Sequence, residues 1–121
     1  MKINVVIADD HRILREGLAA VLNAHGIRVI GQAGNGEEAI LMARELKPDV
    51  VLMDLEMLDV DGVVATRVIK QHMPTIKILM LSSFDENEKV FEAMKAGASG
   101  YVVKRVSQED LVKIIQACCR G

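Results

Sequence analysis

The chain has 121 residues, half of them apolar and 26% charged, with a formal net charge of −2. This is the composition of one ordinary globular domain, and it excludes a disordered or fibrous protein. No block of Lys or Arg residues occurs, so nothing in the chain favours direct binding to nucleic acid or to an anionic membrane.

The amino-terminal apolar run and the two cysteines bear on location and redox state. The run at residues 3–8 is too short for a signal peptide or a membrane span, so we expect a cytoplasmic protein with no membrane partner. Cys118 and Cys119 are adjacent, and neighbouring residues rarely reach disulfide geometry. We expect both to be free thiols.

Five apolar runs alternate with five segments of helical period. The runs, which we expect to be strands, cover residues 3–8, 27–31, 50–54, 76–81 and 98–103. The segments between and after them predict helices that begin near His11, Glu37, Gly62, Asp85 and Ser107. Gly26, Pro48, Pro74 and Gly97 mark where the first four helices stop.

The spacing also predicts which helix residues face the core. The apolar side of the second helix is expected to consist of Ala39, Ile40, Ala43 and Leu46. In the fourth helix, Val90, Phe91 and Met94 are expected to point inward.

Strict alternation of strands and helices through short loops predicts right-handed crossovers and a parallel sheet with helices on both faces. The second strand mixes Arg28 and Gln32 with apolar residues, which suits a sheet edge. The other strands are nearly continuous apolar runs, so the strand order 2-1-3-4-5 fits best. We therefore expect one α/β domain, a doubly wound, flavodoxin-like three-layer sandwich with a five-stranded parallel sheet.

Polar side chains stand where four of these strands end. They are Asp9 and Asp10 after the first strand, Asp54 after the third, Ser82 after the fourth and Lys104 after the fifth. In an open parallel sheet, ligands bind beyond the carboxyl ends of the strands. Taken singly, each residue has an ordinary alternative, namely a turn or helix cap for Asp54 and Ser82 and a surface lysine for Lys104.

Three neighbouring carboxylates repel each other, each pair by roughly 1 to 4 kcal/mol, unless a cation neutralises them. All-oxygen donors favour Mg²⁺ or Mn²⁺, and Mg²⁺ in such sites often completes its shell with phosphate oxygens. Lys104 and Ser82 offer the positive charge and the hydrogen-bond donor that phosphoryl oxygens need, and an aspartate can be the nucleophile. The sequence therefore predicts that Asp54 becomes an aspartyl phosphate.

With these residues, the whole chain resembles the receiver domain of bacterial two-component response regulators. The resemblance implies that Asp9 and Asp10 hold Mg²⁺, with Asp10 as a direct ligand and Asp9 acting largely through water. It also implies that Asp54 is both a metal ligand and the phosphorylated residue, and that the backbone carbonyl of Glu56 is another ligand.

The resemblance also assigns roles in signalling. It makes Lys104 and Ser82 part of the phosphorylation chemistry, with Ser82 as the switch hydroxyl and Tyr101 as the aromatic residue whose orientation reports activation. It implies phosphorylation by a sensor histidine kinase. A receiver catalyses only its own phosphorylation and dephosphorylation, so it is not an enzyme in the usual sense.

The sequence Asp10-His11-Arg12 and the cysteines near the end are similar to the NarL/FixJ-type subclass, whose members usually carry a carboxy-terminal helix-turn-helix domain. We expect residues 1–121 to be the receiver domain and the chain to continue past Gly121 into that output domain. The partners implied are the kinase, this output domain and a second copy after phosphorylation, with DNA contacted only through the output domain.

Four alternatives remain at this stage. One is a stand-alone receiver that acts by protein contact. Another is a haloacid-dehalogenase-type phosphatase, whose nucleophile belongs on the first strand rather than at Asp54. A cobalamin module would need the motif Asp-x-His-x-x-Gly, which begins at Asp9 but has Leu14 where the glycine should be, so His11 is expected to be an exposed first-turn residue. A flavin module would place phosphate where Asp9 and Asp10 repel it.

Overall fold

The computed structural model describes residues 2–57, 60–83 and 87–120. In these ranges the strands are β1 Asn4–Ala8, β2 Arg28–Ala33, β3 Val50–Asp54, β4 Lys77–Ser82 and β5 Gly100–Val103. The helices are α1 Arg12–Ala24, α2 Gly36–Leu46, α3 Gly62–His72, α4 Asn87–Ala96 and α5 Gln108–Arg120. The predicted beginning of the fourth helix, at Asp85, lies outside the described residues.

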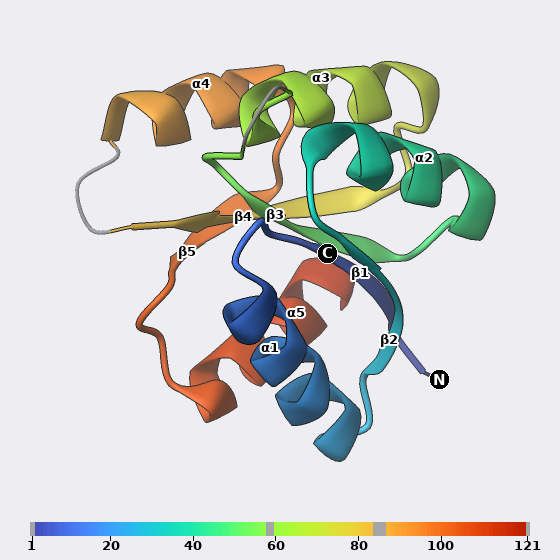
Figure 1. The fold of residues 1–121 in the computed structure, drawn as a ribbon, viewed down its shortest axis with the longest axis vertical. Helices are drawn as coiled ribbons and strands as arrows, with labels where there is room; N and C mark the ends of the chain where they lie inside the picture. The colour runs from blue at the N-terminus through green and yellow to red at the C-terminus, as the bar shows by residue number, and fades with distance from the viewer. Residues whose placement is uncertain (1, 58–59, 84–86, 121) are drawn as a thin grey trace.

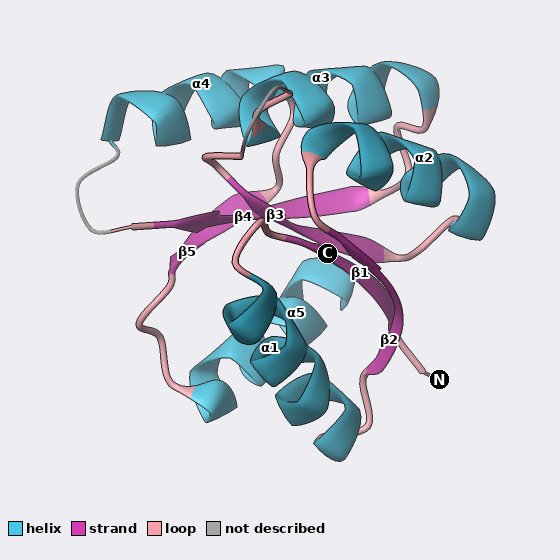
Figure 2. Cartoon of the chain, in the orientation of Figure 1, coloured by secondary structure: helices cyan, strands magenta, loops and turns pink. Residues whose placement is uncertain are grey.

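The five strands form one parallel sheet in the order β2-β1-β3-β4-β5. Helices α1 and α5 cover one face, and α2, α3 and α4 cover the other (Figures 1 and 2). The predicted doubly wound α/β sandwich and its strand order are therefore confirmed. No helix in the described ranges is both long enough and apolar enough to cross a lipid bilayer.

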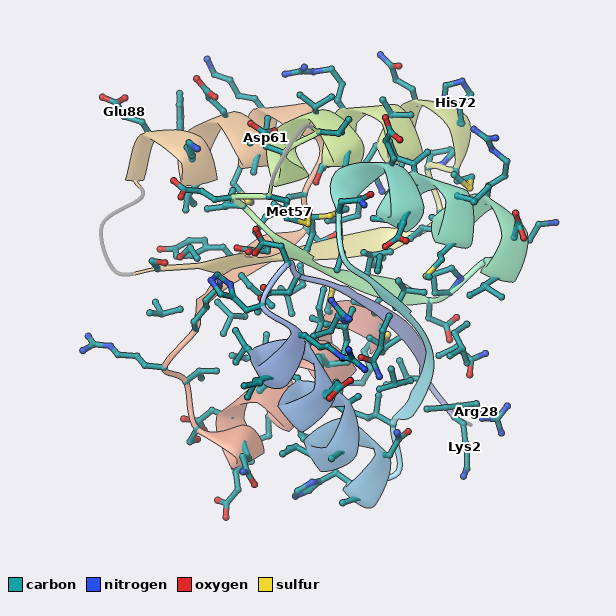
Figure 3. The ribbon with its side chains drawn as sticks, in the orientation of Figure 1. Lys2, Arg28, Met57, Asp61, His72 and Glu88 are labelled. Atoms are coloured by element: carbon teal, nitrogen blue, oxygen red, sulfur yellow. The ribbon has the colours of Figure 1, made fainter. Side chains whose placement is uncertain are left out.

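Successive strand residues point to opposite faces, and this alternation builds two cores. The core under α2, α3 and α4 includes Val6, Ala8, Val51, Met53, Ile78 and Met80. The core under α1 and α5 includes Val5, Ile7, Val50, Leu52, Leu79 and Leu81. Because β1 and β3 are covered on both faces, they read as unbroken apolar runs in the sequence. Charged side chains such as Lys2, Arg28 and Glu88 point outward from the molecule (Figure 3).

Some helix residues predicted to be inward are exposed. Phe91 is 62% exposed and Met94 is 41% exposed, so the prediction for the fourth helix is wrong at both positions. The helix packs through the small side chain of Ala93, which is fully buried, and the Lys95 ammonium lies 4.6 Å from the centroid of the Phe91 ring. In the second helix, Leu46 is 43% exposed because it occupies the last turn.

Side-chain caps fix where three helices begin. Asn35 accepts a hydrogen bond from the Glu38 amide, and Asp61 accepts one from the Val64 amide. The Ser107 hydroxyl accepts one from the amide of Asp110, as the sequence predicts. Each such cap stabilises its helix by about 1 kcal/mol.

Gly62 fixes the beginning of α3 against the end of β3. Its amide donates a hydrogen bond to the carbonyl of Leu55 over 3.0 Å. A Cβ atom at this position would overlap the backbone carbonyl oxygen of Asp54. Only glycine therefore allows the helix to begin this close to the strand that carries Asp54.

We expect Gly62→Ala to lower the free energy of unfolding by about 1–3 kcal/mol, as overpacking against rigid backbone does. Urea denaturation measures this change. Gly17→Ala is the matched control, because Gly17 lies exposed in α1 and an added Cβ there meets nothing within 4 Å. The control should gain up to about 1 kcal/mol from helix propensity. Equal stability of the Gly62 variant and the wild type would contradict the close contact.

Candidate functional site

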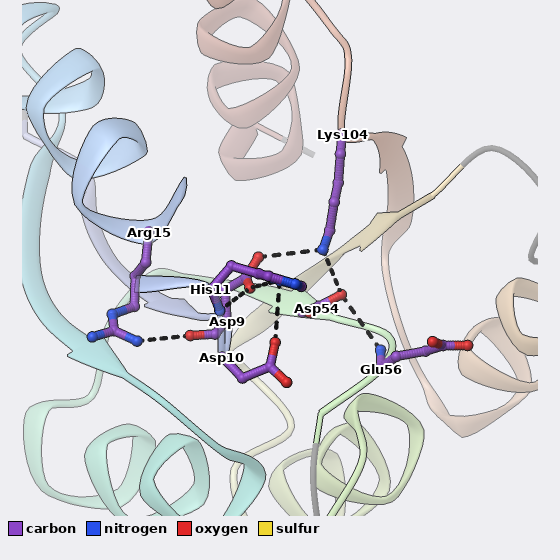
Figure 4. Close-up of polar contacts among 7 residues, drawn as sticks. All are labelled: Asp9, Asp10, His11, Arg15, Asp54, Glu56 and Lys104. Atoms are coloured by element: carbon purple, nitrogen blue, oxygen red, sulfur yellow. Dashed lines mark hydrogen bonds and ion pairs between the residues drawn. The ribbon is translucent and has the colours of Figure 1, made fainter. Parts of the chain in front are cut away.

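The site lies where neighbouring strands end at the carboxyl edge of the sheet. Ala8 of β1 is paired with Met53 of β3, so Asp9 and Asp54 leave the sheet side by side. Lys104 follows β5 directly, and its amide donates to the carbonyl of Ser82 over 2.8 Å, which continues the β4–β5 ladder by one residue. The resulting cluster is drawn in Figure 4.

Two of the carboxylates are buried. Asp9 is 0% exposed and Asp54 is 2% exposed, while Asp10 lies at the rim of the site. Ligand atoms of Asp9, Asp10, His11 and Asp54 all lie within 4.8 Å of one another. Buried carboxylates at this separation are unfavourable as anions unless positive charge lies beside them.

Lys104 supplies one such charge. Its ammonium nitrogen Nζ lies 3.1 Å from Asp54 Oδ1 and 3.5 Å from Asp9 Oδ2. Burial by itself lowers the pKa of a lysine, but the facing carboxylates of Asp54 and Asp9 outweigh it and raise the pKa of Lys104 above its ordinary value. The lysine is therefore held in its charged form between the two acids.

Burial raises the pKa of Asp54 to about 6, and the negative charge of Asp9 adds to this rise. The Lys104 ammonium and the Glu56 amide, which donates to Asp54 Oδ1 over 3.4 Å, oppose the rise without cancelling it. The Asp54 carboxylate at the end of β3 is therefore poorly solvated and still largely ionised at neutral pH.

The second oxygen of each buried carboxylate is placed where a cation could bind. Asp9 Oδ2 and Asp54 Oδ2 are buried, and neither makes a hydrogen bond within the described residues, although the Lys104 ammonium lies 3.5 Å from Asp9 Oδ2. A buried oxygen left without a donor costs about 1–3 kcal/mol, and more when it is charged. A divalent ion with oxygen ligands would satisfy both, so the residues present fit Mg²⁺ or Mn²⁺.

Arg15 and His11 also lie at the site, although the sequence predicted no contact with the acids for either. Arg15 of α1 donates from Nη1 to the backbone carbonyl of Asp9 over 2.8 Å and thereby braces the turn after β1. His11 was predicted to be an exposed first-turn residue, and its side chain is 68% exposed. It is the N-cap residue of α1, however, and its Nδ1 lies 3.0 Å from Asp9 Oδ1 and 3.2 Å from Asp10 Oδ1.

The other predicted residues lie around the cluster. Ser82 is 3% exposed, and it comes one residue after Leu81, the strand partner of Asp54. The carboxylate of Glu56 pairs with Lys89 Nζ over 3.2 Å, so only its backbone faces the site. Tyr101 lies on the edge strand β5 and is 53% exposed, outside the cluster. The metal-ligand and switch roles of these residues remain predictions.

The family model for the response regulator receiver domain matches residues 5–116. The chain belongs to this family. It is 44% identical over 122 residues to response regulator protein VraR of Staphylococcus aureus, and the alignment covers all of this chain and 58% of VraR. The receiver domain thus spans somewhat more than half the length of the curated relatives that it matches.

Solved structures agree with this assignment. The signal receiver domain of the response regulator NarL from Mycobacterium tuberculosis superposes with a TM-score of 0.94 at 30% identity, covering 99% of this chain and 98% of that one. A DNA-binding response regulator of the LuxR family from Staphylococcus aureus gives a TM-score of 0.91 at 26% identity, with coverages of 97% and 98%. These relatives agree with the predicted NarL/FixJ-type subclass.

The family assignment excludes three of the four alternatives left open by the sequence. The chain is a receiver domain of a two-component response regulator, and not a haloacid-dehalogenase-type phosphatase or a cobalamin or flavin module. Receiver domains are signalling proteins rather than classical enzymes, and they bind Mg²⁺ at an acidic pocket. The cluster of Asp9, Asp10 and Asp54 has this character.

We expect the metal-free receiver domain to lose stability as the pH rises from about 4 to about 6, the window between the ordinary pKa of Asp54 and its value in the fold. The folded state binds the Asp54 proton more tightly than the unfolded chain does, so this contribution is complete below pH 4 and is lost as the proton leaves. A rise of about two pKa units corresponds to a loss on the order of 2–3 kcal/mol.

Urea denaturation in EDTA at several pH values measures this loss. Asp54→Asn is the control, because the amide has no proton to release, and its stability should fall less across the same window. Parallel pH profiles for the two proteins would contradict the raised pKa of Asp54.

Proposed function

We propose that Asp54 accepts a phosphoryl group from a sensor histidine kinase in a Mg²⁺-dependent reaction. The observation that carries this proposal is the asymmetric environment of the buried Asp54 carboxylate. Its Oδ1 is held by the Lys104 ammonium and the Glu56 amide, while its Oδ2 has no hydrogen-bond partner among the described residues. The lone pairs of Oδ2 are therefore available to attack phosphorus.

In the proposed reaction, an oxygen of Asp54 forms a bond to phosphorus as the bond from phosphorus to the imidazole nitrogen of the kinase breaks. The imidazole keeps the electron pair of that bond and takes a proton from water. Lys104 holds a phosphoryl oxygen by its ammonium, and the Ser82 hydroxyl donates to another. With a pKa of about 6, Asp54 is mostly ionised at pH 7 and needs no separate base.

The metal-binding groups are proposed to be Asp10, Asp54, the backbone carbonyl of Glu56, and Asp9 largely through water. When bound, Mg²⁺ or Mn²⁺ neutralises part of the charge on the carboxylates and the phosphoryl oxygens. The proposal is supported by the ligand atoms of Asp9, Asp10 and Asp54, which lie within 4.8 Å of one another. Hydrolysis of the aspartyl phosphate at the same site would return the domain to its resting state.

We propose that Ser82 and Tyr101 convert phosphorylation into a change of surface. Ser82 is buried at the end of β4, next to the strand position opposite Asp54, and Tyr101 lies half exposed on β5. In this proposal, Ser82 moves toward the phosphoryl group and the ring of Tyr101 turns inward. The surface of α4, β5 and α5 then differs between the two states, which gives a partner something to distinguish.

The output is proposed to be transcriptional. This chain covers 58% of VraR, and one similar solved structure is a DNA-binding response regulator of the LuxR family. We infer that the whole protein couples this receiver to a helix-turn-helix output domain and forms a homodimer on phosphorylation. A stand-alone receiver that acts by protein contact is the alternative, and the length of the natural gene product distinguishes the two.

Incubation with a small-molecule phosphodonor and Mg²⁺ should add one phosphoryl group to the wild-type chain, as read by intact mass, because Asp54 needs no kinase residue for the bond to phosphorus. Asp54→Asn should remain folded and gain no phosphate mass. Asp110→Asn is a matched control in the exposed first turn of α5 and should be labelled like the wild type. Labelling of the Asp54 variant at the wild-type rate, or labelling unaffected by EDTA, would refute the proposal.

Tyr101 is the only tyrosine in a chain without tryptophan, so tyrosine fluorescence reports on this residue alone. A beryllofluoride phosphoryl mimic should change the Tyr101 emission in the wild type if the ring moves into a different environment. Lys104→Ala and Ser82→Ala should reduce this change at least about threefold while remaining folded by circular dichroism. Equal fluorescence changes in all three proteins would show that neither side chain relays the signal.

A further inference from the structure

His11 is a group at the site that the proposed phosphorylation chemistry does not use. It stands between the end of β1 and the first residue of α1, with its backbone amide donating to Asp9 Oδ1 over 2.8 Å. This bond turns the chain so that the ring returns toward the carboxylates rather than away from them. In Figure 4 the imidazole lies beside Asp9 and Asp10, on the same side as Asp54.

The separation between the donor atoms of His11 and Asp10 matches that of two neighbouring ligands of one octahedral ion. Nδ1 of His11 lies 3.0 Å from Asp9 Oδ1 and 3.2 Å from Asp10 Oδ1. Two neighbouring ligands of an octahedral ion with bonds of about 2.0–2.1 Å are about 3 Å apart. The donor atoms of His11, both acids and Asp54 also lie within 4.8 Å of one another.

The carboxylates around this imidazole carry more negative charge than the Lys104 ammonium neutralises. Asp54 Oδ2 is buried without a hydrogen-bond partner in the described residues, and Asp10 and Asp9 Oδ1 face His11. The Lys104 ammonium lies on the other side of the cluster, against Asp54 Oδ1 and Asp9 Oδ2. An ion among these acids would have a nitrogen donor within reach as well as oxygen donors.

We propose that the His11 imidazole is a direct ligand of the divalent ion and makes this site prefer Mn²⁺ to Mg²⁺ relative to an all-oxygen site. Imidazole binds transition-metal ions well, whereas Mg²⁺ strongly prefers oxygen. This inference rests on the proposed function, because it concerns the ion that assists phosphorylation of Asp54. It adds a role to a residue that the sequence predicts only to be exposed in the first turn.

The contacts also fit a different role, in which His11 donates a hydrogen bond from Nδ1 to Asp9 and Asp10 and only orients them. Such a residue would affect the binding of Mg²⁺ and Mn²⁺ alike, since it would act through the carboxylates. A direct ligand would affect Mn²⁺ more. It would also leave a nitrogen signature on the bound ion.

Pulsed electron paramagnetic resonance of the Mn²⁺-loaded wild-type chain should show ¹⁴N coupling of the size given by directly bound imidazole. The coupling should change to that of ¹⁵N when histidine is isotopically labelled. His11→Ala should lose it. The chain has three histidines. His25→Ala and His72→Ala are matched controls and should keep the coupling, because each of these rings contacts a backbone carbonyl within its own helical turn.

Competition between Mn²⁺ and Mg²⁺, followed through the signal of free Mn²⁺, gives the second readout. His11→Ala should lower the ratio of Mn²⁺ to Mg²⁺ affinity at least about tenfold, while the two control variants leave it unchanged. Wild-type Mn²⁺ without nitrogen coupling would overturn the ligand assignment, and equal losses of both affinities in His11→Ala would make the residue a positioning group instead. Failure of the wild type to bind either ion would overturn the proposed metal site itself.

Discussion

The central interaction of the site is the pairing of one ammonium, that of Lys104, with the two buried carboxylates of Asp9 and Asp54. Asp9 and Asp54 are almost without solvent contact, and Lys104 reaches both of them from the end of the edge strand β5. Removing either acid would leave one carboxylate paired with the ammonium. Removing the lysine would leave two buried carboxylates that repel each other. One ammonium does not neutralise two carboxylates, so the site keeps negative charge that favours the binding of a cation.

Ordinary strand geometry brings these three side chains together. β1 and β3 are neighbours in register, so residues that follow their last apolar positions emerge together. β5 lies at the edge, two strands from β3, and the length of the lysine side chain spans that distance. A shorter cation at position 104 would not reach Asp54. The sheet order thus determines which residue type each strand end must carry.

The sequence predicted the parts of the molecule that follow from local rules. Apolar runs followed by a charged residue identified the strands and the residues Asp9, Asp54 and Lys104, because strand period and the alternation of strands with helices can be read along the sequence. Burial on α4 could not be predicted from spacing, since Ala93 and Met94 both fit the helical period and tertiary packing selected the smaller one. The contact of His11 depends on a turn held by the Asp9 side chain, which a periodicity argument does not contain.

The close approach of Gly62 to Asp54 makes the two sides of the site differ in how they are held. On one side, α3 begins against the Asp54 carbonyl, and Arg15 and the amide–carbonyl bond from Asp9 to Ala33 hold the backbone after β1. On the other side stands β5, which has a strand neighbour on only one edge and meets the acids through a single long side chain. The backbone after β1 and at the beginning of α3 is therefore held by backbone contacts, whereas β5 reaches the acids only through the side chain of Lys104.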